Sequence, residues 1–168
     1  MIVVNNRKSM QEATIRVGGC DITSKISLKQ LRVITDNKLS FKSHVDYVCK
    51  RAATAIAVLS RVMANSSSVC SSKRRLLASV VVSIPRYGDP VWVSALSANF
   101  NVRKLKSTQS PMCLRGISAY RTVSREAACV SAAMMPSKLL VEEDEECYAL
   151  RGTGNARSNI KAVTVAKL

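Results

Sequence analysis

The sequence contains few aromatic and few acidic residues. Phe, Trp and Tyr make up 4% of the 168 residues, so the core must consist of aliphatic side chains, Ala and Met, which suit packed helices better than a large β-sandwich. There are 11 acidic residues against 26 Lys and Arg, which gives a net charge of +15. Such an excess of positive charge attracts polyanions, so we expect nucleic acid as a partner in preference to a merely solubilising basic surface.

The sequence has no paired metal ligands and no apolar run of membrane-spanning length, and we expect no signal peptide. The six cysteines form no C-x-x-C pair and there is one histidine, His44, so we expect no metal and no cofactor. The longest apolar run, residues 76–84, is too short to cross a bilayer. We therefore expect an intracellular protein, cytoplasmic or nuclear, whose thiols are reduced and serve mainly in packing.

Local patterns predict a mainly α (α+β) fold, in which an N-terminal β-hairpin and short strands precede a bundle of about four to five helices. Residues 13–17 and 20–22 flank Gly18-Gly19, an arrangement typical of a hairpin, and residues 31–34 form a further β-prone run. These patterns divide the chain into a β-rich segment at 1–36, a helical domain at 37–151 and a flexible basic tail at 152–168.

The predicted helices are located by their apolar periodicity and by their start and stop signals. Apolar residues recur at steps of three and four from Phe41 to Met63, and Ser40 is the expected N-cap of this first helix. The other predicted boundaries are a second helix from a cap at Ser71 or Ser72 to a stop at Pro85, a third from about Phe100 to Ile117 interrupted at Pro111, and two shorter helices starting at Ser124 and Ser137.

No catalytic residue is predicted. The neighbouring acids, residues 142–146, fall on a predicted helix and not on strand tips, so they do not fit a two-metal site. We interpret them as a solvated helix face that pairs with basic residues elsewhere. His44 has no nucleophile in a recognised signature beside it, and no phosphate-binding glycine loop occurs. The chain is therefore not expected to be an enzyme by itself.

The candidate functional residues are cations on the exposed sides of the predicted helices, where they could contact phosphates. Residues 73–75 begin the second helix, where positive charge opposes the helix dipole; a docked phosphate would relieve this, and a solvated charge run explains it equally well. Tyr87, Trp92 and Tyr120 could stack on bases, but we expect core positions, above all for Trp92. The nine nucleic-acid-binding candidates are Lys42, Lys50, Arg51, Lys73, Arg74, Arg75, Arg103, Lys104 and Lys106.

Several segments resemble, in order, the region that follows the catalytic core of non-LTR (LINE-type) retrotransposon reverse transcriptases. The similarity extends from about residue 15 to residue 150. The matching segments are residues 33–41 (VITDNKLSF), 44–45 (HV), 57–63 (AVLSRVM), 74–81 (RRLLASVV), 87–88 (YG), 90–92 (PVW) and 118–128 (SAYRTVSREAA).

The resemblance implies the end of the palm followed by the thumb, a helical clamp on template and primer. The expected partners are then an RNA or DNA template and primer, together with the polymerase domains that this chain lacks. Because the family's paired catalytic aspartates lie upstream of the matching region, the resemblance implies a fragment of an RNA-directed DNA polymerase that binds nucleic acid without sequence preference and has no polymerase activity alone.

Some positions depart from the family's pattern in a way that looks like decay. Arg32 stands where the family has glycine, and Asp89 replaces a small residue. An interior proline costs a helix about 3 kcal/mol, so the chain could be a non-functional translation of a decayed element. A second alternative to a reverse transcriptase fragment is a basic helical adaptor for an acidic protein or membrane surface. The remaining departures are Pro85 and Arg86 in place of aliphatic residues, and Pro111 and Gly116 within another helix.

Overall fold

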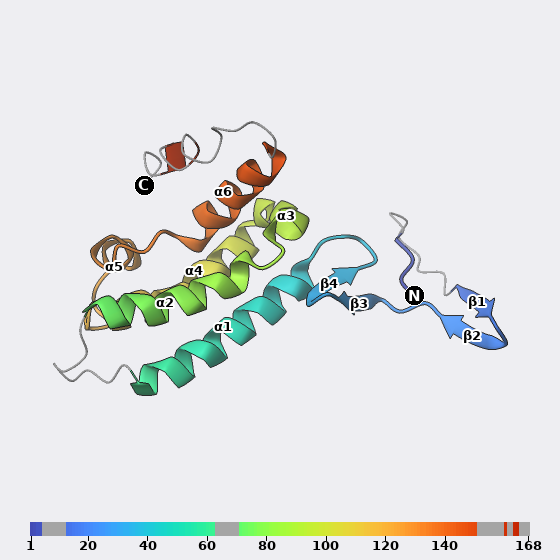
Figure 1. Ribbon diagram of the computed structural model, residues 1–168, viewed down its shortest axis with the longest axis horizontal. Coiled ribbons are helices and arrows are strands. Elements are labelled where there is room, and N and C mark those ends of the chain that lie inside the picture. Colours follow the sequence, from blue (N-terminus) through green and yellow to red (C-terminus); the bar gives the residue numbers. More distant parts are fainter. Residues whose placement is uncertain (5–12, 63–70, 151–159, 161–162, 165–168) are drawn as a thin grey trace. The chain divides into compact units, whose positions relative to one another are not determined.

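The computed structural model describes residues 1–4, 13–62, 71–150, 160 and 163–164. In these ranges two antiparallel β-hairpins precede six α-helices, as Figure 1 shows, so the predicted mainly α (α+β) class is confirmed. The chain divides into two compact units, Met1–Tyr47 and Val48–Leu168. The first turns of the first helix thus group with the strands. The predicted tail at 152–168 lies outside the described residues, apart from residues 160, 163 and 164.

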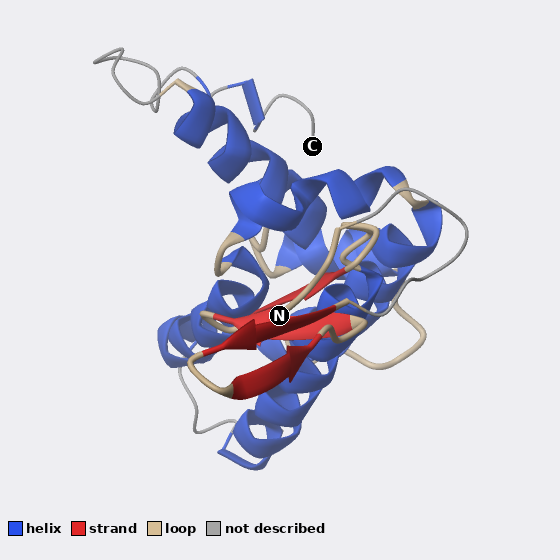
Figure 2. Cartoon of the chain, turned by 90° about the vertical axis from the view of Figure 1, so that its right-hand side faces the viewer, coloured by secondary structure: helices blue, strands red, loops and turns tan. Residues whose placement is uncertain are grey.

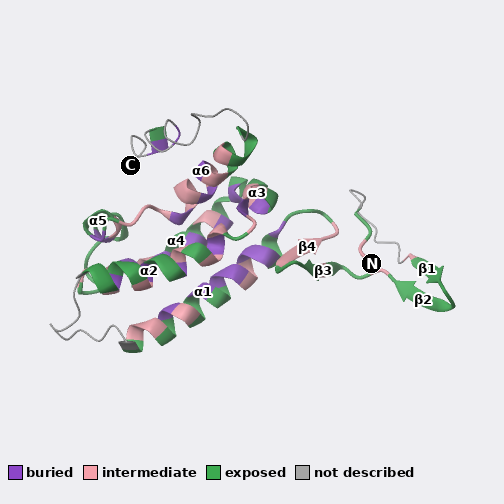
Figure 3. Ribbon diagram, viewed as in Figure 1, coloured by how far each residue is buried: buried purple, intermediate pink, exposed green. Residues whose placement is uncertain are grey.

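The first hairpin forms where the sequence predicts it. Strand β1 (Thr14–Val17) pairs with β2 (Cys20–Thr23), and Val17 lies opposite Cys20. The turn between them requires the left-handed backbone that glycine adopts readily, with φ of 56° at Gly18 and 87° at Gly19. Both strands are exposed along their whole length (Figure 3), so they contribute no core.

The second hairpin was not predicted in this form. Strand β3 (Ser27–Gln30) pairs with β4 (Val33–Asp36), so the run at 31–34 is not one β-segment but a turn followed by a strand. Leu31 and Arg32 make the turn with φ of 47° and 67°. A side chain in this left-handed region costs roughly 1 to 2 kcal/mol, and glycine avoids that cost.

A hydrogen-bonded aspartate closes the turn before helix α1 (Lys42–Val62). Asp36 accepts hydrogen bonds from the Ser40 hydroxyl at 2.6 Å and from the Phe41 backbone N–H at 2.9 Å. Ser40 is therefore not the N-cap that we predicted, because its hydroxyl donates to Asp36 and the helix begins two residues later. Burial raises the pKa of Asp36, but these hydrogen bonds outweigh it and the pKa is lowered.

His44 joins α1 to β4. Its Nδ1 accepts a hydrogen bond from the backbone N–H of Ile34 at 3.2 Å, and the ring is 1% exposed. Burial lowers the pKa of His44, which favours the neutral ring. This histidine is thus explained by its place in the fold.

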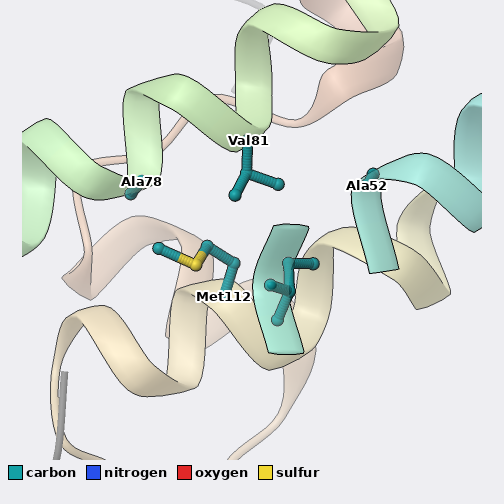
Figure 4. Close-up of a cluster of buried hydrophobic side chains, with 5 residues drawn as sticks. Ala52, Ala78, Val81 and Met112 are labelled. Carbon is teal, nitrogen blue, oxygen red and sulfur yellow. The ribbon is translucent and has the colours of Figure 1, made fainter. Parts of the chain in front are cut away.

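The second unit is built around helix α4 (Asn99–Gly116), against which the later turns of α1 and helix α2 (Ser71–Arg86) pack. Figure 4 shows Met112 of α4 between side chains of these helices. Two of the five buried residues are alanines, which let the helix backbones approach closely. The buried cluster consists of Ala52, Ile56, Ala78, Val81 and Met112.

Two further helices complete this unit. Helix α5 (Arg125–Ser131) packs on α4 through Cys113, Ala128 and Ala132, and the Ser124 hydroxyl caps it by accepting from the backbone N–H of Ala127. Helix α6 (Ser137–Ala149) begins where Gln109 of α4 accepts hydrogen bonds from the backbone N–H and hydroxyl of Ser137 at 2.8 and 2.9 Å. Both predicted starts are confirmed.

A short connection was not predicted. Helix α3 (Asp89–Trp92) and the 3₁₀ helix η1 (Val93–Ser97) link α2 to α4. They add to the predominance of helix over strand that Figure 2 shows. Trp92 is 0% exposed, so the prediction of a core position for it is confirmed. Within the described part of the chain, no helix combines the length and the apolar character that a bilayer crossing requires.

The prolines disturb the helices less than the sequence indicates. Pro85 was predicted to stop α2, yet the helix continues to Arg86 with Pro85 buried in its last turn. Pro111 was predicted to interrupt α4, and this is wrong, since α4 runs through it. The missing N–H leaves the carbonyl of Ser107 without its helical bond. Because Ser107 and Pro111 are both exposed, water can reach that carbonyl. Ser71 and Ser72 lie inside α2, so neither is its cap.

An ion cluster ties α2 and α3 to α6. Arg86 at the end of α2 donates two hydrogen bonds of 2.6 Å to the carboxylate of Asp144 on α6. Asp89 lies beside this pair and is 4% exposed. Burial and the neighbouring Asp144 raise the pKa of Asp89 to about 7, against the pull of Arg86. Arg86 and Asp89, two positions at which the sequence departs from the resemblance, thus share one partner.

The buried Asp89 predicts a pH dependence of stability. The folded chain holds the Asp89 proton up to a pH of about 7, whereas an unfolded chain releases it near 3.8. The protonated carboxyl therefore adds to the free energy of unfolding at low pH, and this stabilisation is lost as pH rises from about 3.8 to about 7. Asp89→Asn should reduce the loss of stability with rising pH, and thermal unfolding midpoints measured between pH 4 and 8 test this. The exposed Asp21→Asn is the control and should keep the slope of the parent chain. Equal slopes in all three proteins would contradict this prediction.

Candidate nucleic-acid interface

The predicted phosphate-contacting residues lie on three helices and not at one site. Lys42, in the first unit, begins α1, and Lys104 is half-buried with its ammonium 5.5 Å from the centre of the Phe100 ring. The exposed candidates of the second unit are Lys50 and Arg51 on α1, Lys73 and Arg75 on α2, and Arg103 and Lys106 on α4. These cations can add long-range attraction, but they do not define a pocket.

Arg74 differs from its neighbours because it is buried, with 6% exposure. Its Nη1 donates a hydrogen bond of 3.4 Å to the carbonyl of Arg115, in the last turn of α4. Carbonyls in a last turn lack helical partners, and a cation there also suits the helix dipole. Arg74 therefore stabilises the end of α4 instead of facing solvent.

The end of α4 has the hydrogen bonds of a Schellman motif. Ser118 has a left-handed φ of 54°, and its N–H donates to the carbonyl of Arg115 at 3.3 Å. The N–H of Ala119 donates to the carbonyl of Leu114 at 3.0 Å. These are the two bonds that define the motif. Since Arg74 and Ser118 share the Arg115 carbonyl as acceptor, Arg74 also braces this turn.

A groove of about 450 Å³ lies where this turn meets the end of α1. Tyr120 lines it and is 84% exposed, so this tyrosine is not the core anchor that we expected. Arg115 and Arg121 line it as well, and among the residues that the structure describes no acidic one does. The lining residues are Ser60, Pro111, Leu114, Arg115, Ala119, Tyr120 and Arg121.

This composition fits one strand of nucleic acid. A tyrosine ring can stack on any base, while guanidinium groups contact phosphates. The volume is that of an ordinary small-ligand site. Sequence reasoning singled out neither Ser60 nor Arg121, because these residues are far apart in the chain and only the turn after α4 brings them to one groove.

Part of the acidic run at 142–146 is engaged within the fold. Asp144 pairs with Arg86, as described, and Glu142 lies 3.4 Å from the Lys138 ammonium. Glu143 is 6% exposed, so the prediction of a solvated face is wrong for this residue, which lies on the buried side of α6. In the described ranges, no cluster of three or more His, Cys, Asp and Glu could hold a metal ion.

Comparison with known proteins gives no match. No protein-family model matches the chain, and neither does a curated protein or a solved structure.

The adjacent Arg74 and Arg75 offer a matched test of the turn. Arg74→Gln removes a buried hydrogen bond donor to the Arg115 carbonyl and should lower the free energy of unfolding by about 1 to 3 kcal/mol. Arg75→Gln removes the same charge from an exposed position and should change it by less than about 0.5 kcal/mol. Urea unfolding of both variants decides the matter. If Arg75→Gln were as destabilising as Arg74→Gln, the assigned role of Arg74 would be wrong.

Proposed function

We propose that this chain is a fragment of a non-LTR retrotransposon reverse transcriptase, the end of the palm and the thumb, that binds a nucleic-acid strand without sequence preference and does not polymerise by itself. The groove beside Tyr120 is the observation that carries the binding proposal, because it combines an exposed ring with Arg115 and Arg121, and its described lining contains no acid. Segment 118–128, which resembles the family, supplies three of its residues.

Binding in this groove would be insensitive to base sequence. A base stacks on the Tyr120 ring through its π-face, which every base has, while Arg115 and Arg121 neutralise flanking phosphates. The net charge of +15 adds long-range attraction for the strand. The exposed cations of α1, α2 and α4 then serve as secondary phosphate contacts.

One structural detail supports the resemblance itself, and a second favours a folded fragment over a decayed one. Arg32 stands where the resemblance expects glycine, and its φ of 67° is a conformation that glycine adopts without cost. Arg86 and Asp89 also depart from the family's pattern, but both lie in the cluster with Asp144. Two departing residues that interact with the same carboxylate are easier to reconcile with a retained fold than substitutions scattered over the chain.

Replacing the Tyr120 ring is the direct test of stacking. Tyr120→Ala should weaken binding of single-stranded oligonucleotides by about tenfold, since one stacked base contributes roughly 1 to 3 kcal/mol. Tyr120→Phe keeps the ring and should bind like the parent chain. Tyr87→Ala is the control, because Tyr87 is 51% exposed and lies outside the groove. Fluorescence anisotropy with labelled homopolymers of DNA and RNA measures the affinities.

The salt dependence of the same titrations separates stacking from charge. Affinity should fall steeply as salt rises, with a slope that Tyr120→Ala leaves unchanged and Arg121→Gln lowers by about 0.7. Unchanged affinity in Tyr120→Ala, or preference for anionic lipid vesicles over either homopolymer, would refute this function.

A further inference from the structure

Two cysteines from different helices are in contact. The sulfur of Cys113 on α4 lies 3.1 Å from the sulfur of Cys129 on α5, and both thiols are free. A disulfide needs the two sulfurs at about 2.05 Å, so they must approach by about 1 Å. The sequence separation of the pair gave no sign of this contact.

The two cysteines differ in how far solvent can reach them. Cys113 is 0% exposed, whereas Cys129 is half-buried and lines a cavity of about 120 Å³ between α4 and α5. Lys106, Arg125 and Glu126 also line this cavity, and all three are exposed, so it opens to solvent. Two cations against one carboxylate favour a negatively charged reactant at the entrance.

The two thiols therefore have different roles in an exchange reaction. Burial and the contact with Cys129 raise the pKa of Cys113, so Cys113 holds its proton. Thiol–disulfide exchange begins with a thiolate that an oxidant can reach. Cys129 is the cysteine that an oxidant can reach, because it lines the cavity, while Cys113 is placed to attack second.

We propose that Cys113 and Cys129 are a redox-active dithiol that a small anionic disulfide, of the oxidised glutathione type, converts to an intramolecular disulfide. The Cys129 thiolate attacks one sulfur of the small disulfide, whose S–S bond breaks and releases one thiolate. The Cys113 sulfur then loses its proton, attacks the Cys129 sulfur and releases the second. The two protons of the cysteines end on the two released thiols, so the protein is oxidised by two electrons and the small disulfide is reduced.

The new bond would close the segment that carries the groove. Residues 114–128 lie between the two cysteines and include Arg115, Tyr120 and Arg121. A disulfide across this segment restricts the unfolded chain, so oxidation should raise the thermal unfolding midpoint. The redox reaction itself needs no bound nucleic acid, and it can be tested apart from strand binding.

Peptide mapping of the full, reduced chain tests the proposal. After incubation with oxidised glutathione, free thiols are alkylated and the protein is digested with trypsin without reduction. The expected product links peptide 107–115 to peptide 126–138, with the loss of two hydrogens. Exposed Cys20 should carry glutathione and shows that the oxidant acted. Glutathione on Cys20 with peptides 107–115 and 126–138 both alkylated and unlinked would overturn the proposal.

Variants establish the order of attack. Cys113→Ala should leave glutathione bound to Cys129, and Cys129→Ala should leave Cys113 unmodified. Lys106→Gln with Arg125→Gln should slow oxidation by glutathione severalfold but not oxidation by uncharged hydroxyethyl disulfide. Modification of Cys113 in Cys129→Ala at the parent rate would contradict the assigned roles. If a variant does not fold, the peptide map of the parent chain still decides whether the disulfide forms.

Discussion

The packing of Met112 is the contact on which the second unit most depends. This side chain is 0% exposed and contacts residues of α1 and α2 from its place on α4. With few aromatic residues in the chain, the core relies on close approach of helices at Ala52 and Ala78. Shortening a buried methionine to alanine typically costs about 2 to 5 kcal/mol, a large part of the stability of such a domain.

The position of α4 also places both candidate functional features. Its last turn closes in the Schellman motif that carries the chain to Tyr120, and Cys113 lies on the side of α4 that faces α5. Arg74 reaches from α2 to that same last turn. A change in the packing of α2 on α4 would therefore alter the groove without touching any residue that contacts a strand.

Periodic features were predictable from the sequence, whereas features that depend on tertiary contacts were not. The apolar spacing of α1 and the glycines between β1 and β2 identify those elements directly. The turn at Leu31 and Arg32 has no glycine or asparagine to mark it, so β3 was missed. Pro111 was read as a break because the exposure of Ser107 is invisible in a sequence. Arg74 and Arg75 look equivalent in the sequence, but they point about 100° apart around the helix axis, so that Arg74 is buried and Arg75 is exposed.

Photo-crosslinking tests most directly whether a strand lies in the groove beside Tyr120, as we propose. A 4-thiouridine oligonucleotide irradiated with the whole chain should crosslink to tryptic peptide 116–121, which carries Tyr120 and Arg121. Tyr87 lies in peptide 87–103, outside the groove, and serves as the internal reference. Crosslinks concentrated in peptide 87–103, with 116–121 unmodified, would contradict the account.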